Sequence, residues 1–346
     1  MRKALSSAST LMDYAAAFQN SSKAVRRAYP WPDALLHDCV DQLERVIAAS
    51  PARQLNARNW AINMGRLLYG LKQFTGTSAG LDALLFKVAA LLSDTSRPWI
   101  SDAQTIGNAL YGLQNLTASA GTEAVLTALA AHIPRVPQLS GQQVGNALYG
   151  LHNLTASPGT EAVLTALAAH IPRAPQLNAQ EIGNALYGLH NLTASPGTEA
   201  VLTALAAHIP GAPQLSGQQV GNALYGLQKL TASAGTEAVL TALAAHIPQA
   251  PQLDGQGIGN ALYGLQKLTS SVGTEAVLTA LAAHIPRAPQ LNAQEIGNAL
   301  YGLKNLTASA GTEAVLTALA AHIPRAPQLN AQEIGNALYG LQKLTA

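Results

Sequence analysis

Residues 178–215 read NAQEIGNALYGLHNLTASPGTEAVLTALAAHIPGAPQL, and this stretch recurs with small changes along most of the chain. Within it, the string GNALYGL begins at glycines that are each separated by 38 residues: Gly107, Gly145, Gly183, Gly221, Gly259, Gly297 and Gly335. A fixed period of this length over seven copies indicates an array of structural repeats and not a conventional domain.

Each unit carries the signals of two helices. The first begins at a capping residue such as Asn178, and three copies complete a capping box with a glutamate: Glu181, Glu295 and Glu333. In the copy that starts at Asp102, the apolar residues keep a helical spacing over Ile106, Ala109, Leu110, Leu113 and Leu116. The second helix begins near Ser157 with a proline at its first position, and the prolines of IPRAP end it.

Two short amphipathic helices cannot bury their apolar faces alone, but stacked neighbours can. The predicted fold class is therefore all-α, an α-solenoid that forms a right-handed superhelix of two-helix repeats. We expect an N-terminal helical cap over 1–63, a degenerate first repeat over 64–101, and seven near-identical repeats over 102–346, the last of which stops after its first helix. Terminal repeats normally carry a polar cap, so we expect the chain to be part of a longer protein or to have been trimmed.

Composition excludes several classes of protein. A single cysteine excludes a disulfide framework and a Cys-ligated metal cluster, and it indicates an intracellular, reducing compartment. No apolar run is long enough to cross a membrane, and the N-terminus is a poor secretory signal, which leaves organelle import and bacterial effector export open. Because no nucleophile–base pair, paired carboxylates or phosphate-cradling loop is present, we expect no catalysis, cofactor or metal. We expect a monomer.

A polar stripe on the first helix is the most informative feature for function. At about 100° per residue, Gln104, Asn108, Tyr111 and Asn115 align opposite the apolar face. The first three are the same in all seven copies, whereas the fourth is Asn or Lys and the residue before it is Gln, His or Lys. A reader of a linear polymer needs this layout of a constant platform with one or two changing side chains per module.

These residue types suit nucleic acid. Tyrosine can stack on a base, Asn and Gln can pair with base edges, and His or Lys can reach a base or a phosphate. The predicted RNA-contacting residues are Gln104, Asn108, Tyr111, Gln114, Asn115, Gln142, Asn146, Tyr149, His152, Asn153, Gln180, Asn184, Tyr187, His190, Asn191, Gln218, Asn222, Tyr225, Gln228, Lys229, Gln256, Asn260, Tyr263, Gln266, Lys267, Gln294, Asn298, Tyr301, Lys304, Asn305, Gln332, Asn336, Tyr339, Gln342 and Lys343.

Structural explanations stand beside this one. The glycines Gly107 and Gly112 can serve tight packing between first helices, Tyr111 can be a packing residue, and Asn108 can form a ladder of hydrogen bonds. Histidines recur once per repeat near the end of the second helix, as at His132, and we expect them to interact with a helix C-terminus because a ladder does not converge on one metal ion.

Charge opposes nucleic-acid binding. The first hundred residues carry a net charge of +5, but residues 101–346 carry −3. We expect the acidic side chains of the second helix, such as Glu123, to lie on its exposed side, away from the stripe.

The period of 38, the two-helix unit and the segments Leu177–Leu189 and Leu291–Leu303 resemble the octotricopeptide repeat family. The resemblance covers about residues 55–346. It implies an RNA-binding solenoid, since many members act on organelle transcripts and related repeats occur in bacterial effectors. We therefore predict modular, sequence-specific binding of single-stranded RNA, about one nucleotide per repeat. The alternatives are a DNA reader with the layout of TAL effectors, a protein-interaction scaffold of the armadillo or HEAT type, and a designed array without a natural ligand.

Overall fold

The computed structural model describes residues 5, 7–24, 31–50, 56–95, 102–326 and 328–344. Over these residues the chain forms seventeen α-helices, α2 to α18, and no strand. The prediction of an all-α fold built from consecutive helix pairs is confirmed. The chain divides into two compact units, 1–174 and 175–346, and each is described by itself.

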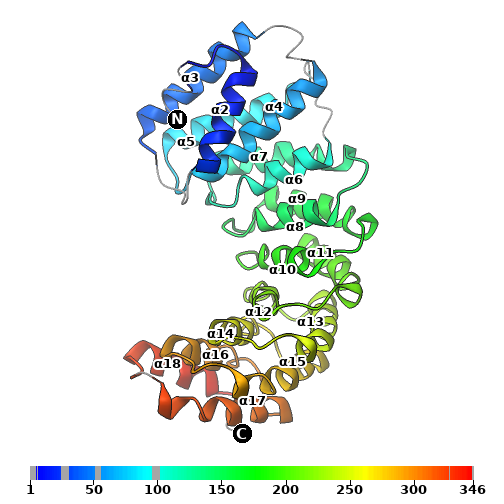
Figure 1. Cartoon of the computed structure of the whole chain (residues 1–346), viewed down its shortest axis with the longest axis vertical. Helices are drawn as coiled ribbons and strands as arrows, with labels where there is room; N and C mark the ends of the chain where they lie inside the picture. The colour runs from blue at the N-terminus through cyan, green and yellow to red at the C-terminus, as the bar shows by residue number, and fades with distance from the viewer. Residues whose placement is uncertain are drawn as a thin grey trace. The chain divides into compact units, whose positions relative to one another are not determined.

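The first unit stacks four helix pairs in two layers. One layer packs α2 on α4, α4 on α6 and α6 on α8, and the other packs α3 on α5, α5 on α7 and α7 on α9 (Figure 1). The bounds are α2 Leu11–Ala24, α3 Asp33–Ala49, α4 Ala57–Gly70, α5 Ala79–Leu92, α6 Ala103–Tyr111, α7 Ala120–Ala130, α8 Gly141–Tyr149 and α9 Pro158–Ala168, with the 3₁₀ turns η2 Leu71–Gln73, η3 Ile133–Arg135 and η4 Ile171–Arg173.

The second unit repeats the same arrangement. The first helices α10, α12, α14, α16 and α18 pack on one another in sequence, as do the second helices α11, α13, α15 and α17 (Figure 1). The bounds are α10 Ala179–Tyr187, α11 Pro196–Ala206, α12 Gly217–Tyr225, α13 Ala234–His246, α14 Gly255–Tyr263, α15 Val272–Ala282, α16 Ala293–Tyr301, α17 Ala310–Ala320 and α18 Ala331–Leu341, with η5 Ile209–Gly211, η6 Ile247–Gln249, η7 Ile285–Arg287 and η8 Ile323–Arg325. Each unit is therefore solenoid-like, and the right-handed superhelix stays a prediction.

The N-terminal cap follows the packing of the repeats. Its helices α2 and α3 lie against α4 and α5 as one repeat lies against the next. Its core contains bulky aromatic rings where the later repeats have small residues. Phe18 and Trp31 both pack on Phe74, with ring centroids 5.5 and 5.0 Å apart. Helix α4 begins at Ala57, so the degenerate repeat starts before the predicted boundary at residue 64.

In the first six repeats of the array, the first helix is shorter than its apolar spacing predicts. Helix α6 ends at Tyr111, and residues 112–116 continue in turns whose amides donate three residues back, from Leu113 to Leu110 and from Leu116 to Leu113. Such turns advance faster around the axis than an α-helix does. The prediction that Asn115 continues the α-helical stripe is therefore wrong for its geometry.

Glycines let adjacent first helices touch. A Cβ added at Gly112, Gly150 or Gly264 would overlap the backbone carbonyl oxygen of a leucine in the preceding repeat. Backbone cannot move aside as a side chain can. The structural explanation of the Gly112 position is therefore confirmed, whereas Gly107 meets only the side chain and Cα of Gln143, at 3.1–3.2 Å.

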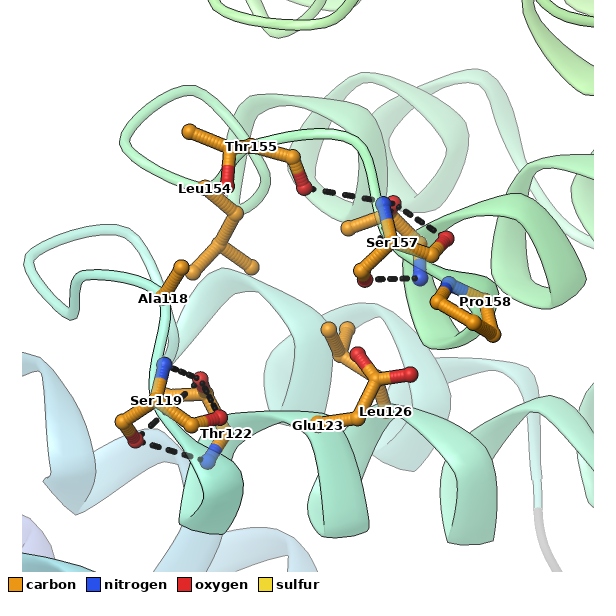
Figure 2. Close-up of a pocket in the computed structure, with 10 residues that line it drawn as sticks. Ala118, Ser119, Thr122, Glu123, Leu126, Leu154, Thr155, Ser157 and Pro158 are labelled. Carbon is orange, nitrogen blue, oxygen red and sulfur yellow. Dashed lines mark hydrogen bonds between the residues drawn. The ribbon is translucent and has the colours of Figure 1, made fainter.

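At least four acidic residues of the second helices are caps, which corrects the prediction that they lie on an exposed side. The carboxylate of Glu123 accepts a hydrogen bond from the backbone amide of Gly159, at the start of the next second helix, at 2.6 Å. Figure 2 shows Glu123 beside Ser157 and Pro158, where α9 begins. In the second unit Glu199, Glu237 and Glu275, which lie two, three and four repeats after Glu123, make the same contact.

Capping accounts for most of the negative charge of the array. Residues 102–344 contain eleven acidic side chains, and at least nine of them accept a hydrogen bond from a backbone amide at a helix N-terminus: Asp102, Glu123, Glu181, Glu199, Glu237, Asp254, Glu275, Glu295 and Glu333. The predicted capping boxes at Glu181, Glu295 and Glu333 are confirmed. The negative net charge therefore has a structural cause in the described residues.

Removing one inter-repeat cap should lower stability. We expect Glu237→Ala to reduce the free energy of unfolding by about 1 kcal/mol, because the amide of Gly273 loses a charged acceptor. Glu313→Ala is the matched control, since Glu313 occupies the same place in α17 but is exposed. Urea denaturation of both variants measures the difference, and equal losses would contradict capping between repeats.

Candidate nucleic-acid interface

The tyrosines of the first helices stack on one another. In the first unit, Tyr69, Tyr111 and Tyr149 form one ladder with ring centroids 6.0 Å apart. In the second unit, Tyr187, Tyr225, Tyr263, Tyr301 and Tyr339 form another, with spacings of 5.7–6.0 Å and interplanar angles of 19–28°. Because each ring faces its neighbour, a base could reach an open ring face only where a ladder ends, as at Tyr339, which is 51% exposed.

In four repeats the first member of the variable pair is buried next to the tyrosines. His190, Gln228, Gln266 and Lys304 are buried, with exposed fractions of 6–8%. The amine of Lys304 donates to the hydroxyl of Tyr301 at 2.7 Å and to Gln266 Oε1 at 3.2 Å, and it lies 3.9 Å from the Tyr301 ring centroid. The expectation that these side chains present themselves to a base is not met in these four repeats, because the turns after the helix direct them inward.

The second member of the pair joins successive repeats. Asn115, Asn153 and Asn305 each donate from Nδ2 to a backbone carbonyl of the preceding repeat, at 2.6–2.7 Å. In two of the three repeats where lysine replaces asparagine, the Nζ of Lys229 and of Lys343 donates to the Asn side chain of the preceding repeat, at 2.8 and 3.0 Å. These lysines are exposed, so they can also meet a ligand.

The glutamine and asparagine of the stripe behave differently. The glutamine at the second position of every first helix is exposed, and the asparagine four residues later is half-buried. None of these fourteen side chains makes a hydrogen bond to another residue that the structure describes. They are Gln104, Asn108, Gln142, Asn146, Gln180, Asn184, Gln218, Asn222, Gln256, Asn260, Gln294, Asn298, Gln332 and Asn336. Their donors and acceptors form a continuous amide ladder in each unit, open to a ligand.

Charge is unevenly placed along the first helices. Their N-terminal ends carry capping carboxylates, such as those of Asp254 and Glu295. The turns at their C-terminal ends carry the exposed amines of Lys229, Lys267 and Lys343. An anionic backbone would therefore lie along the C-terminal edge of the amide ladder, and groups without charge along the other edge.

The recurring histidines hold the ends of second helices. Nε2 of His132 donates to the carbonyl of Leu92, the last residue of α5, at 2.9 Å. Nε2 of His284 and of His322 donates to the carbonyls of Ile247 and Ile285, which begin the turns η6 and η7 that follow α13 and α15. The predicted interaction with a helix C-terminus is confirmed, and it reaches the helix of the preceding repeat. Across the described residues, no group of three His, Cys, Asp or Glu side chains could hold a metal ion.

Burial of the imidazoles makes the fold sensitive to acid. Burial lowers the pKa of His132, His152 and His170 below 6.5. The folded chain then binds fewer protons than the unfolded chain, so stability is full above pH 6.5 and is lost as the pH falls below it. We expect the melting midpoint to be several degrees lower at pH 5.5 than at pH 7.5.

Replacing one buried histidine by the residue found at the same place in other repeats tests whether the histidines cause the pH dependence. His152→Gln introduces the residue that Gln114 and Gln228 represent in other repeats, and it should reduce the pH dependence. Differential scanning calorimetry at both pH values measures it. A midpoint that is unchanged or higher at pH 5.5 would contradict this assignment.

A separate cavity of about 520 Å³ lies between α7 and α9 (Figure 2). Its walls are largely apolar and include Ala118, Leu126, Leu154 and Pro158, with Glu123 at its edge. No residue of the amide ladder lines it.

Comparison with known proteins adds no relative. No protein-family model matches the chain, and no curated protein matches it. Among the helices that the structure describes, none is both long and apolar enough to cross a membrane. The resemblance to octotricopeptide repeats therefore rests on the sequence pattern alone.

Proposed function

We propose that the chain binds single-stranded RNA along the amide ladder, about one nucleotide per repeat, and that it is not an enzyme. The observation that carries this proposal is the set of fourteen glutamine and asparagine side chains that find no partner among the described residues. Amides that protein groups do not satisfy need water or a ligand with both donors and acceptors. Base edges and ribose hydroxyls provide both.

The ladder favours the same base at successive positions. The accessible pair, for example Gln218 and Asn222, is identical in all seven repeats. The first variable residue is buried in four repeats, and the second joins repeats in most of them. Asn and Gln make paired hydrogen bonds to N6 and N7 of adenine. We therefore expect an adenine tract to bind best. This differs from the prediction from the variable pair, in which each repeat selects its own base.

RNA suits the ladder better than DNA. The 2′-hydroxyl is both donor and acceptor and offers the amides further partners. Phosphates contribute less, because among the described residues of the second unit only Lys229, Lys267 and Lys343 present an exposed amine along the C-terminal edge of the first helices. Three such contacts on a single strand correspond to a slope of about −2 in log K against log salt.

Selection from a random RNA pool, followed by titration of adenine, uracil and cytosine tracts and the matching DNA, tests the proposal. We expect enrichment of adenine-rich RNA, at least tenfold weaker binding of the uracil and cytosine tracts, and weaker binding of DNA. Failure to enrich any RNA at low salt would refute the proposal. An affinity that falls steeply with salt and does not depend on the base would show that the protein contacts phosphates and not base edges.

A protein partner is the second candidate, and the apolar cavity between α7 and α9 favours it. A cavity of about 520 Å³ with apolar walls can accept aliphatic or aromatic side chains of a peptide. The cavity and the amide ladder are separate surfaces of the first unit. Retained partner binding after substitution of the ladder glutamines would therefore favour the scaffold function.

A further inference from the structure

One junction of the amide ladder is hollow. A polar cavity of about 250 Å³ lies between α12 and α14. Four side chains of the ladder line it, namely Gln218 and Asn222 from α12 and Gln256 and Asn260 from α14. Asp254, Gly221 and Gly257 complete its lining.

The cavity exists here because a side chain is missing. Position 257 is glycine, whereas the neighbouring repeats carry Gln219 and Glu295 at the same place. In those repeats the side chain fills the junction, since a Cβ added at Gly183 would meet Gln219 at 3.4–3.5 Å. At this junction a Cβ added at Gly221 would instead meet the bare Cα of Gly257 at 3.0 Å.

The size of the cavity suits one planar ring system. Sites for drug-sized ligands occupy about 300–1,000 Å³, so a space of about 250 Å³ fits a single base and little more. The four amides at its wall make no hydrogen bond within the described part of the chain. A base that leaves the strand and enters the cavity would find both donors and acceptors there.

The carboxylate decides which base fits. Asp254 Oδ1 already accepts from the amide of Gly257 at 2.7 Å, which fixes the group at the rim, and a carboxylate retains further acceptor sites. Guanine presents N1–H and N2–H side by side as two donors. Adenine presents only its N6 amine there, and uracil flanks its single N–H with two carbonyl oxygens, which the carboxylate repels.

We propose that the cavity between α12 and α14 is a guanine-specific subsite, which places one guanine within the adenine tract that the other repeats bind. This inference rests on the proposed RNA binding and assigns one position of the bound sequence. Gly257 is then a specificity-determining residue, although it offers no side chain to the ligand.

Selection from the random RNA pool with the unchanged protein and with Gly257→Gln tests the proposal. Gly257→Gln gives α14 the sequence pattern of α8 and α12, so the variant should fold. We expect the unchanged protein to enrich one guanine inside an adenine-rich motif. The variant should lose that preference at least tenfold and enrich adenine at that position instead.

A converse variant guards against indirect effects. Gln219→Gly combined with Ser216→Asp rebuilds the same groups between α10 and α12, and it should add a second preferred guanine one nucleotide from the first. Selection of adenine at every position by the unchanged protein, or the same guanine preference after Gly257→Gln, overturns the subsite alone. Failure of the unchanged protein to enrich any RNA overturns the proposed function as well.

Discussion

Gly264→Ala should destabilise the second unit by about 3 kcal/mol, near the upper end for an overpacked site. An added methyl at Gly264 would overlap the carbonyl oxygen of Leu224, which belongs to the α12 backbone. Relief requires α12 and α14 to separate, and that separation would also open the contact between Tyr225 and Tyr263, now 6.0 Å between ring centroids. The expected drop in melting midpoint is roughly 6–12 °C.

Gly335→Ala provides the control. Gly335 lies in α18, and a Cβ added there meets nothing within 4 Å. The same substitution should raise stability by up to about 1 kcal/mol, because alanine favours a helix more than glycine does. Calorimetry of both variants distinguishes a steric requirement from a general effect of alanine, and a similar change in both would refute the close approach of the first helices.

Replacing three ladder glutamines should abolish most RNA affinity. Gln218, Gln256 and Gln294 are exposed and make no hydrogen bond to described residues, so the triple alanine variant should keep its stability. Each lost base contact costs at least about 1 kcal/mol. Three contacts then correspond to roughly a hundredfold weaker binding of an adenine tract, measured by fluorescence anisotropy.

Three threonines on the second helices provide the matched control. Thr203, Thr241 and Thr279 are exposed and recur at one position of α11, α13 and α15. Their replacement by alanine should leave RNA binding within twofold. Equal losses in the two triple variants would show that the ladder is not the binding surface.

Much of the fold follows from local sequence rules. The period of 38, the capping residue Asn178 with Glu181, and the proline after Ser157 all predict helix ends that the structure contains. The early end of the first helix escaped prediction, because Leu113 and Leu116 keep an apolar spacing that suits both a helix and the observed turns. Spacing alone does not separate the two.

Contacts between repeats were harder to predict. From the sequence, Glu123 is predicted to be a solvated side chain. Its partner, the backbone amide of Gly159, lies in another repeat, and no sequence pattern links the two residues. The sequence also predicts that the variable pair contacts a ligand, because the sequence carries no sign of its contacts with neighbouring residues. In the structure, Lys304 is buried against Tyr301. A systematic signal was present at Gly121 and its equivalents, where glycine is required because a Cβ would meet the carboxylate from the preceding repeat.

Ultraviolet cross-linking of a bound adenine-tract RNA, with the linked residues mapped by mass spectrometry, tests the central claim most directly. If the amide ladder is the RNA-binding surface, cross-links will fall on the first helices and the turns that follow them, within residues 180–191, 218–229, 256–267 and 294–305. Cross-links concentrated on the second helices, α11, α13 and α15, would contradict the account.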